Sequence, residues 1–248
     1  MLKTLLVFTL AASAYGQLAD DFTPPRSNCC LAGSAQTLAN QLQDWNQLGR
    51  YHADNVTLRA QPVPAGRVVF MGDSITDGWK LAEQFPGKPY VNRGISGQTT
   101  AQMLVRMFQD VIDLKPAGLI VFAGTNDIAR NNGMQTLEMI EENLQAMSEL
   151  AKLHGIKVIL CSVMPISDYV PNRNQTRGRP PADILKLNAW IKDYAAKNGF
   201  GFADYYSATV DEKGFLKEGF SGDGLHPNDK GYALMVPVAN AAIEQALR

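Results

Sequence analysis

Short apolar runs that alternate with longer segments of helical periodicity are the feature that most constrains the fold of this chain. The runs predict strands, and the segments between them, near residues 99–112, 135–153, 182–197 and 229–247, predict helices, the last of them kinked by Pro237. Strands that alternate with helices indicate βαβ units, and therefore a parallel sheet that is covered on both faces. The five expected strands are Val68–Met71, Tyr90–Asn92, Leu119–Phe122, Lys157–Cys161 and Phe202–Asp204. The sequence thus predicts an α/β fold in which ligand-binding side chains follow the carboxyl ends of the strands.

The composition excludes several other classes of protein. Of the 248 residues 46% are hydrophobic, and 23 Lys+Arg against 24 Asp+Glu leave a formal charge of −1. Disordered chains combine low hydrophobicity with high net charge, and nucleic-acid-binding proteins usually carry a basic excess. Three cysteines are too few for a disulfide scaffold, and an odd number cannot all pair within the chain. We expect one globular domain and no nucleic-acid partner.

The N-terminal residues 1–16 have the pattern of a signal peptide. Lys3 precedes an apolar stretch from Leu5 to Ala14, and Ala14 and Gly16 place small residues at the −3 and −1 positions of a cleavage site. The apolar stretch is too short to span a bilayer. An exported protein, secreted or periplasmic, with cleavage near Gly16 and no integral membrane segment in the mature chain, is therefore expected; an uncleaved N-terminal helix is the alternative.

Residues 17–66 are expected to form an extension ahead of a main domain at 67–248. Apolar residues at helical spacing predict an amphipathic helix over 35–58, and the Pro- and Gly-containing segment 61–66 ends it. Cys29 and Cys30 are adjacent, and their fate stays open. Cys161 lies in an apolar strand pattern, which favours a small core residue.

A serine follows the first predicted strand, in the segment Gly72-Asp73-Ser74-Ile75-Thr76-Asp77-Gly78-Trp79. A serine at a strand-to-helix turn can expose its hydroxyl at the edge of the sheet while its own N–H stays free. The alternative role for Ser74 is that of a helix N-cap.

Two further strand ends carry hydrogen-bond donors. The third strand runs into Gly124-Thr125-Asn126-Asp127, and the second is followed by Gly97, whose backbone N–H precedes a predicted helix. The N–H groups of Ser74 and Gly97 and the side-chain amide of Asn126 could together stabilise an oxyanion. Turn formation is the structural alternative for Gly97 and Asn126.

His226 is the strongest candidate for a general base among the three histidines. His52 lies ahead of the sheet, and His154 lies at a predicted helix C-terminus. Asp223, three residues before His226, is close enough to fold back onto the imidazole and orient it. The alternative makes Asp223 a turn residue and leaves His226 on the surface.

Cofactor motifs do not accompany these residues. Asp73, Asp127, Asp223 and His226 could gather around a divalent ion, but no His-x-His or His-Glu-x-x-His spacing occurs. No Walker loop or Gly-x-Gly-x-x-Gly follows the first strand, so we expect neither a metal nor a nucleotide cofactor.

Together, these segments resemble the SGNH hydrolases, also called GDSL esterases/lipases, from about Val68 to Gly231. The resemblance implies a flavodoxin-like three-layer α/β/α fold with a five-stranded parallel sheet. It also implies Ser74 as nucleophile, His226 as base, Asp223 as orienting acid, and Ser74, Gly97 and Asn126 as the oxyanion hole. Ile75 replaces the Leu of the family's name, a substitution of similar volume.

The expected function is hydrolysis of short-chain carboxylic esters through an acyl-enzyme on Ser74, with a small ester or an acylated polysaccharide as substrate. A lysophospholipase, lipase or arylesterase is the alternative within the family, and a carbohydrate-binding module with an inactive site is the alternative outside enzymes. Possible substrate-binding residues are Trp79, as a flat face for a sugar ring, and Tyr169 and Arg173 in the Pro-rich stretch 165–181. Packing in the core is the alternative for Trp79, and the more common use of a tryptophan. The sequence does not determine the oligomeric state.

Overall fold

The computed structural model describes residue 35, residues 38–39 and residues 42–248. The chain divides into two units, Met1–Trp45 and Asn46–Arg248. In the first unit, the described residues 35, 38–39 and 42–43 are helical. The predicted signal peptide, Cys29 and Cys30 lie outside the described residues.

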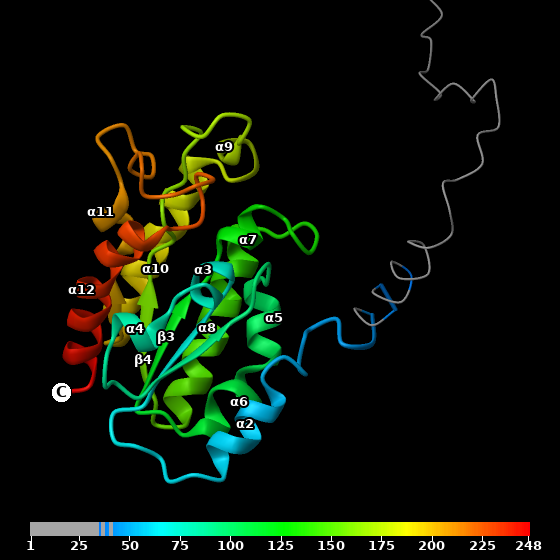
Figure 1. The fold of residues 1–248 in the computed structure, drawn as a ribbon, viewed down its shortest axis with the longest axis vertical. Coiled ribbons are helices and arrows are strands. Elements are labelled where there is room, and N and C mark those ends of the chain that lie inside the picture. Colours follow the sequence, from blue (N-terminus) through cyan, green and yellow to red (C-terminus); the bar gives the residue numbers. More distant parts are fainter. Residues whose placement is uncertain (1–34, 36–37, 40–41) are drawn as a thin grey trace, which may run out of the picture. The chain divides into compact units, whose positions relative to one another are not determined.

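The second unit is built on a parallel five-stranded sheet in the order β2-β1-β3-β4-β5 (Figure 1). This order is that of flavodoxin-like folds, as predicted. Val68 pairs with Tyr90 of β2 on one side and with Gly118 of β3 on the other. The strands are β1 (Val68–Gly72), β2 (Tyr90–Gly94), β3 (Gly118–Phe122), β4 (Lys157–Cys161) and β5 (Gly201–Ala203).

Helices connect the strands and cover both faces of the sheet. The longer ones are α2 (His52–Arg59), α8 (Leu137–Leu153), α10 (Pro181–Asn198) and α12 (Asp229–Ala246), and α12 runs through Pro237 without ending there. The shorter ones are α3 (Ser74–Asp77), α4 (Leu81–Gln84), α5 (Thr100–Val105), α6 (Met107–Asp110), the 3-10 turn η1 (Ile112–Leu114), α7 (Thr125–Ile128), α9 (Gln175–Gly178) and α11 (Tyr205–Thr209).

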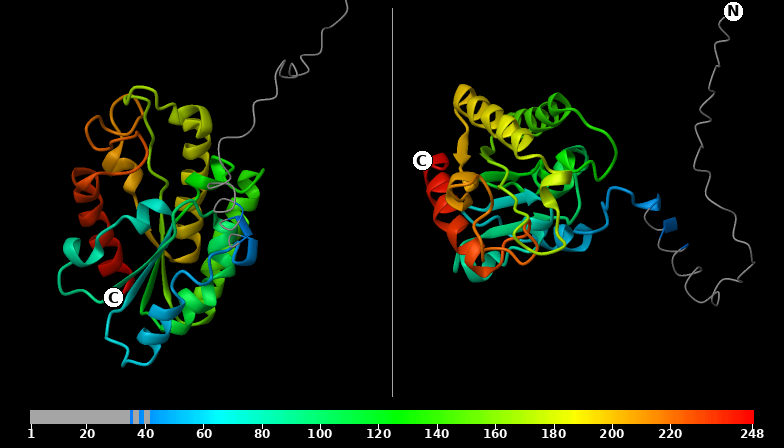
Figure 2. Two further views of the ribbon diagram at one scale, coloured as in Figure 1. Left: turned by 45° about the vertical axis from the view of Figure 1, so that its right-hand side comes forward. Right: turned by 90° about the horizontal axis from the view of Figure 1, so that it is seen from above.

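Alternate residues of each central strand enter two separate cores, which makes three layers. Val69 and Met71 of β1 pack with α5, α6, α8 and α10, whereas Val68 and Phe70 pack with α12 and the short helices α3, α4 and α11. Figure 2 shows α12 on one side of the sheet and α8 and α10 on the other. Cys161 is buried in the α12-side core, which confirms it as a core residue.

The helix expected near 99–112 is broken at Arg106 into α5 and α6. The side chain of Arg106 is fully buried, and its guanidinium donates to Gln98 Oε1 (2.7 Å), Asp110 Oδ2 (2.9 Å) and the carbonyl oxygen of Gly72 (3.2 Å). A buried guanidinium must be paired in this way, so these partners determine the local path of the chain.

The amphipathic helix expected over 35–58 is also interrupted. Residues 44–46 and 48–51 form turns, Gln47 has a positive φ of 55°, and α2 begins only at His52. Residues 46–66 are grouped with the second unit. Polar side chains rather than an apolar stripe anchor them: Asn55 donates to Asp110 Oδ1 (2.6 Å) and accepts from Arg93 (2.7 and 3.0 Å).

No helix within the described part of the chain is long and apolar enough to cross a membrane.

Candidate active site

The turn that follows β1 holds Ser74 at the first position of α3. A Cβ atom on Gly72 would lie 2.0 Å from Thr76 Oγ1 and 2.8 Å from the carbonyl oxygen of Phe122, so only glycine allows α3 to turn back so closely. Asp73 caps the helix, because its Oδ1 accepts the N–H of Ile75 at 2.9 Å. The structure therefore gives the N-cap role to Asp73 and leaves the hydroxyl of Ser74 free for another partner.

That partner is His226, which lies in the loop that precedes α12. Ser74 Oγ lies 2.9 Å from His226 Nε2, and His226 Nδ1 lies 2.7 Å from Asp223 Oδ2. Ser74 and His226 are 152 positions apart in sequence, and the fold brings them into hydrogen-bond contact. This hydroxyl–imidazole–carboxylate series has the connectivity needed to activate a nucleophile.

The second oxygen of Asp223 is held by its own loop. Asp223 Oδ1 accepts the N–H groups of Leu225 (3.0 Å) and His226 (2.8 Å) and the hydroxyl of Ser221 (3.1 Å), which leaves Oδ2 for the imidazole. Burial by itself raises the pKa of Asp223, but the hydrogen bonds from the His226 ring and from the two N–H groups outweigh it and hold the pKa well below its usual range. Ser221, two residues before Asp223, was not singled out in the sequence.

The sheet order places the two other candidate loops on either side of Ser74. β1 lies between β2, which leads to Gly97, and β3, which leads to Asn126. Gly97 has a φ of +83°, a conformation that favours glycine, and among the described residues its N–H and that of Ser74 donate to no backbone acceptor. Asn126 is buried, and its amide donates to the carbonyl oxygen of Gln98 at 3.1 Å, which ties the two loops together.

Two buried carboxylates are next to site residues in sequence: Asp73 precedes Ser74, and Asp127 follows Asn126. Burial raises the pKa of Asp73 to about 6, against the opposing hydrogen bond from Ile75 and the charges of His226 and Arg179. Burial also raises the pKa of Asp127, whose Oδ1 accepts the N–H (2.9 Å) and hydroxyl (2.5 Å) of Thr100. Within the part of the chain that the structure describes, no three His, Cys, Asp or Glu side chains form a group that could hold a metal ion.

The interpretation of Trp79 as a platform for a sugar ring is wrong. Its side chain is only 2% exposed and packs in an aromatic cluster against Phe70, Phe85, Tyr205 and Tyr232, with ring centroids 5.4–5.9 Å apart. Burial of its large apolar surface stabilises the core, and the buried ring cannot offer a face to a ligand.

Tyr169 and Arg173 do not contact the Ser74–His226 pair. The Tyr169 hydroxyl donates to Asp211 Oδ2 at 2.5 Å, and Tyr169 lines a separate cavity of about 270 Å³ together with Pro171 and Lys217. The Arg173 side chain is exposed. The arginine of this segment that does reach the site is Arg179, which the sequence pattern did not distinguish from its neighbours.

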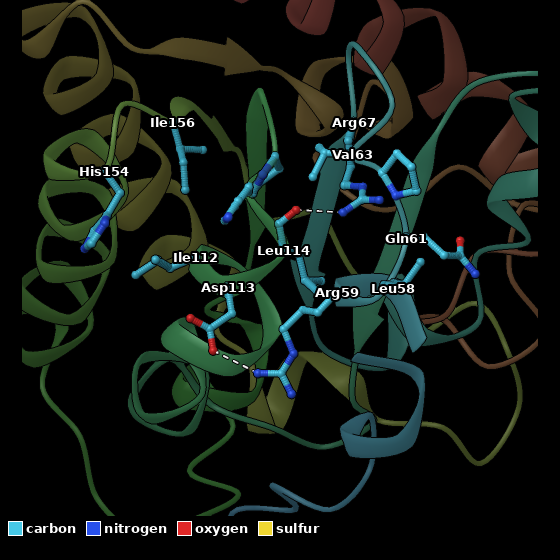
Figure 3. A pocket seen from close by; sticks show the side chains of 13 residues that line it. Leu58, Arg59, Gln61, Val63, Arg67, Ile112, Asp113, Leu114, His154 and Ile156 are labelled. Carbon is cyan, nitrogen blue, oxygen red and sulfur yellow. Dashed lines mark hydrogen bonds and ion pairs between the residues drawn. The ribbon is translucent and has the colours of Figure 1, made fainter. Parts of the chain in front are cut away.

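The cleft beside Ser74 is open, and its lining is part polar and part apolar. Its volume is about 530 Å³, and it is lined by Ser74, Asp77, Gly78, Ser96, His226, Pro227, Asp229 and Tyr232. A cavity of about 820 Å³ lies elsewhere, beside residues that precede β1, β3 and β4, and therefore at the amino ends of the strands (Figure 3). There Arg67 donates to the carbonyl oxygen of Leu114 at 2.7 Å, and His154 is among the lining residues. The larger cavity thus contains none of the predicted catalytic residues.

Comparison with known proteins identifies the family and the fold. The model of the GDSL-like lipase/acylhydrolase family matches residues 70–234. The crystal structure of a GDSL-like lipase from Bacteroides thetaiotaomicron VPI-5482 is 39% identical in sequence and superposes with a TM-score of 0.74, covering 82% of this chain and 100% of that one. The chain belongs to the GDSL-like lipase/acylhydrolase family, which confirms the resemblance and the fold class.

Two curated relatives match over parts of their length. An uncharacterized lipoprotein of Bacillus subtilis (strain 168), YqeF, is 39% identical over 118 residues, which is 40% of this chain and 49% of that protein. The acetylxylan esterase of Xylanibacter ruminicola is 24% identical over 227 residues, which is 75% of this chain and 45% of that protein. The chain therefore spans about half the length of these relatives.

Proposed function

We propose that the protein is a serine esterase that transfers an acyl group from an ester to water through a covalent intermediate on Ser74. The observation that carries this proposal is the continuous hydrogen-bonded series Ser74 Oγ–His226 Nε2 (2.9 Å) and His226 Nδ1–Asp223 Oδ2 (2.7 Å). A carbohydrate-binding module with an inactive site would have no need to hold a hydroxyl, an imidazole and a carboxylate in this order.

In the proposed reaction, Ser74 Oγ attacks the ester carbonyl while His226 Nε2 takes the hydroxyl proton. The carbonyl oxygen becomes an oxyanion, stabilised by the N–H groups of Ser74 and Gly97 and the side-chain amide of Asn126. His226 then gives its proton to the leaving alcohol. Water attacks the acyl-enzyme by the same steps, which releases the acid and returns the proton to Ser74. Asp223 keeps the imidazole oriented and stabilises its charged form.

The proposed substrate is a short acyl group, such as acetyl, on a polar and sugar-like alcohol. Most of the residues that line the cleft beside Ser74 are polar, among them Asp77, Ser96 and Asp229, whereas a long acyl chain needs a broad apolar surface. The acetylxylan esterase among the relatives supports the same class of substrate.

The nucleophile is tested by Ser74→Ala, with Ser96→Ala as the matched control. Both serines line the cleft, but Ser96 Oγ donates to Asp77 Oδ2 at 2.7 Å rather than to His226. We expect Ser74→Ala to abolish covalent labelling by a fluorophosphonate and to lower kcat by several orders of magnitude, and Ser96→Ala to leave the labelling intact. Labelling that is lost only in Ser96→Ala would contradict the assignment.

The substrate class is tested by comparing kcat/KM on p-nitrophenyl acetate, octanoate and palmitate, followed by acetate release from acetylated xylan. We expect acetate to be the best ester and xylan to be deacetylated. A preference for palmitate would favour a lipase, and activity without acetate release from any glycan would favour an arylesterase or lysophospholipase.

Export and the division into residues 1–16, an extension and a catalytic domain from 67 belong to the same proposal. Export is supported by Lys3, the apolar stretch Leu5 to Ala14 and the small residues Ala14 and Gly16, and the boundary near 67 by the Pro- and Gly-containing segment 61–66. N-terminal sequencing of the exported protein is expected to begin at Gln17.

A further inference from the structure

The segment that joins β4 to α10 contains α9 (Figure 1), and two of its side chains, those of Gln175 and Arg179, contact residues of the candidate site. Arg179 Nε donates to Thr125 Oγ1 at 3.0 Å, Nη1 to Gln175 Oε1 at 3.2 Å and Nη2 to Asn126 Oδ1 at 3.4 Å. A guanidinium presents its donors in a rigid planar fork. Arg179 therefore joins the turn after β3 to α9 in one fixed arrangement.

The contacts of the Asn126 carboxamide specify which way it points. Its oxygen accepts from Asn131 Nδ2 (3.0 Å) and from Arg179, while its nitrogen donates to the carbonyl oxygen of Gln98 (3.1 Å). A rotation by 180° would place the NH₂ group against two donors and the oxygen against the Gln98 carbonyl. Because Arg179 is a permanent cation, it opposes this rotation more strongly than a neutral donor does. The second N–H of Asn126 stays available for an oxyanion.

The short helix α9 also contacts the loop that carries Asp223. Gln175 of α9 accepts from Arg179 through Oε1 and donates through Nε2 to the carbonyl oxygen of Asp223 at 3.0 Å. Burial lowers the pKa of Arg179, and the negative charges of Asp73 and Asp223 act in the opposite direction. The guanidinium thus lies within the electrostatic reach of both carboxylates.

We propose that Arg179 is a positioning residue of the esterase, which fixes the orientation of the Asn126 carboxamide so that one N–H faces the oxyanion. The inference rests on the proposed function and adds to it a residue that acts through Asn126 rather than on the substrate. Arg179 would contribute to the stabilisation of the transition state and contribute little to the binding of the ester.

The experiment measures kcat and KM on p-nitrophenyl acetate for Arg179→Ala and Arg179→Gln, with Arg177→Ala as the matched control. Arg177 lies on α9, two residues before Arg179, and within the described residues its side chain makes no hydrogen bond or ion pair. We expect kcat to fall by about 10- to 100-fold at nearly constant KM, as part of the roughly 10²–10³-fold effect of a lost oxyanion donor. Arg177→Ala is expected to keep the wild-type kcat.

A double-mutant cycle with Asn126→Ala separates positioning from other roles. If Arg179 acts through the carboxamide, its removal lowers kcat no further once Asn126 is alanine. Added guanidinium ion is expected to restore part of the activity of Arg179→Ala but not of the Arg179→Ala/Asn126→Ala variant. Equal losses in both backgrounds, or a rise in KM alone, would overturn the proposal.

The same measurements distinguish a failure of the proposed function from a failure of the positioning role of Arg179. If the wild-type protein neither hydrolyses the ester nor takes the fluorophosphonate on Ser74, both proposals fall together. If the wild type is labelled and active while Arg179→Ala and Arg179→Gln match Arg177→Ala, only the positioning role is refuted. Melting temperatures of all variants identify any loss that comes from unfolding.

Discussion

Replacing Asp73 by asparagine should change how stability depends on pH. Asp73 is 2% exposed, and burial raises its pKa from 3.8 in the unfolded chain to about 6. Below about pH 3 the carboxyl of Asp73 is protonated in both states, so its burial costs no stability there. Between about pH 4 and 6 the unfolded chain loses the proton and the folded protein retains it, so the free energy of unfolding falls as pH rises. A difference of roughly two pKa units corresponds to about 3 kcal/mol in total.

Asparagine has no proton to lose, so Asp73→Asn should abolish this part of the pH dependence. We expect the unfolding free energy of the variant minus that of the wild type to increase by about 3 kcal/mol between pH 3 and pH 7, and to stay nearly constant above pH 7. Urea unfolding of both proteins, followed by tryptophan fluorescence at half-unit pH intervals, measures this difference in unfolding free energy. Asp193→Asn, which replaces a carboxylate that is 59% exposed on α10, provides the baseline. A flat difference curve for Asp73→Asn would refute the reasoning.

Three further predictions concern the site and the core. Asn126→Ala should lower kcat by roughly 10²–10³-fold when measured well below its melting temperature, and an unchanged kcat would show that Asn126 only shapes its turn. Asp223→Asn combined with His226→Ala should be barely slower than His226→Ala alone in steady-state assays, because the two residues act as a unit; additive losses would contradict this. The Cys161 thiol, whose pKa burial raises, should resist iodoacetamide in the folded protein and react in urea, as read by mass spectrometry of its peptide. Rapid modification of Cys161 without denaturant would contradict the packing described above.

The sequence predicted the strands well because their apolar runs are buried on both faces. All five expected runs are strands of the sheet, and the residues singled out after β1, β2 and β3 lie at the carboxyl ends of adjacent strands. The prediction worked less well where polar contacts decide the local structure. The break at Arg106 and the short α2 depend on partners more than thirty residues away in sequence, such as Gly72 for Arg106 and Asp110 for Asn55.

Trp79 and Arg179 show the same limit at the site. Periodicity and motifs do not specify which side of a turn a tryptophan faces, and the aromatic cluster that buries Trp79 combines residues from β1, α11 and α12. Arg179 has two arginine neighbours in its segment, and only the path of the chain through α9 directs this one toward Asn126.

The sequence by itself determined the class of this protein, because a strand-to-helix turn with Gly72 and Ser74 and an Asp223-x-x-His226 pair are local patterns with local physical causes. Tertiary structure alone decided the distances among them. The sheet order places Ser74 between the Gly97 and Asn126 loops. The loop that precedes α12 brings His226 Nε2 to 2.9 Å from Ser74 Oγ, although the two residues are 152 positions apart in sequence. Such contacts depend on the packing of two cores against one sheet, since no short stretch of sequence contains both partners.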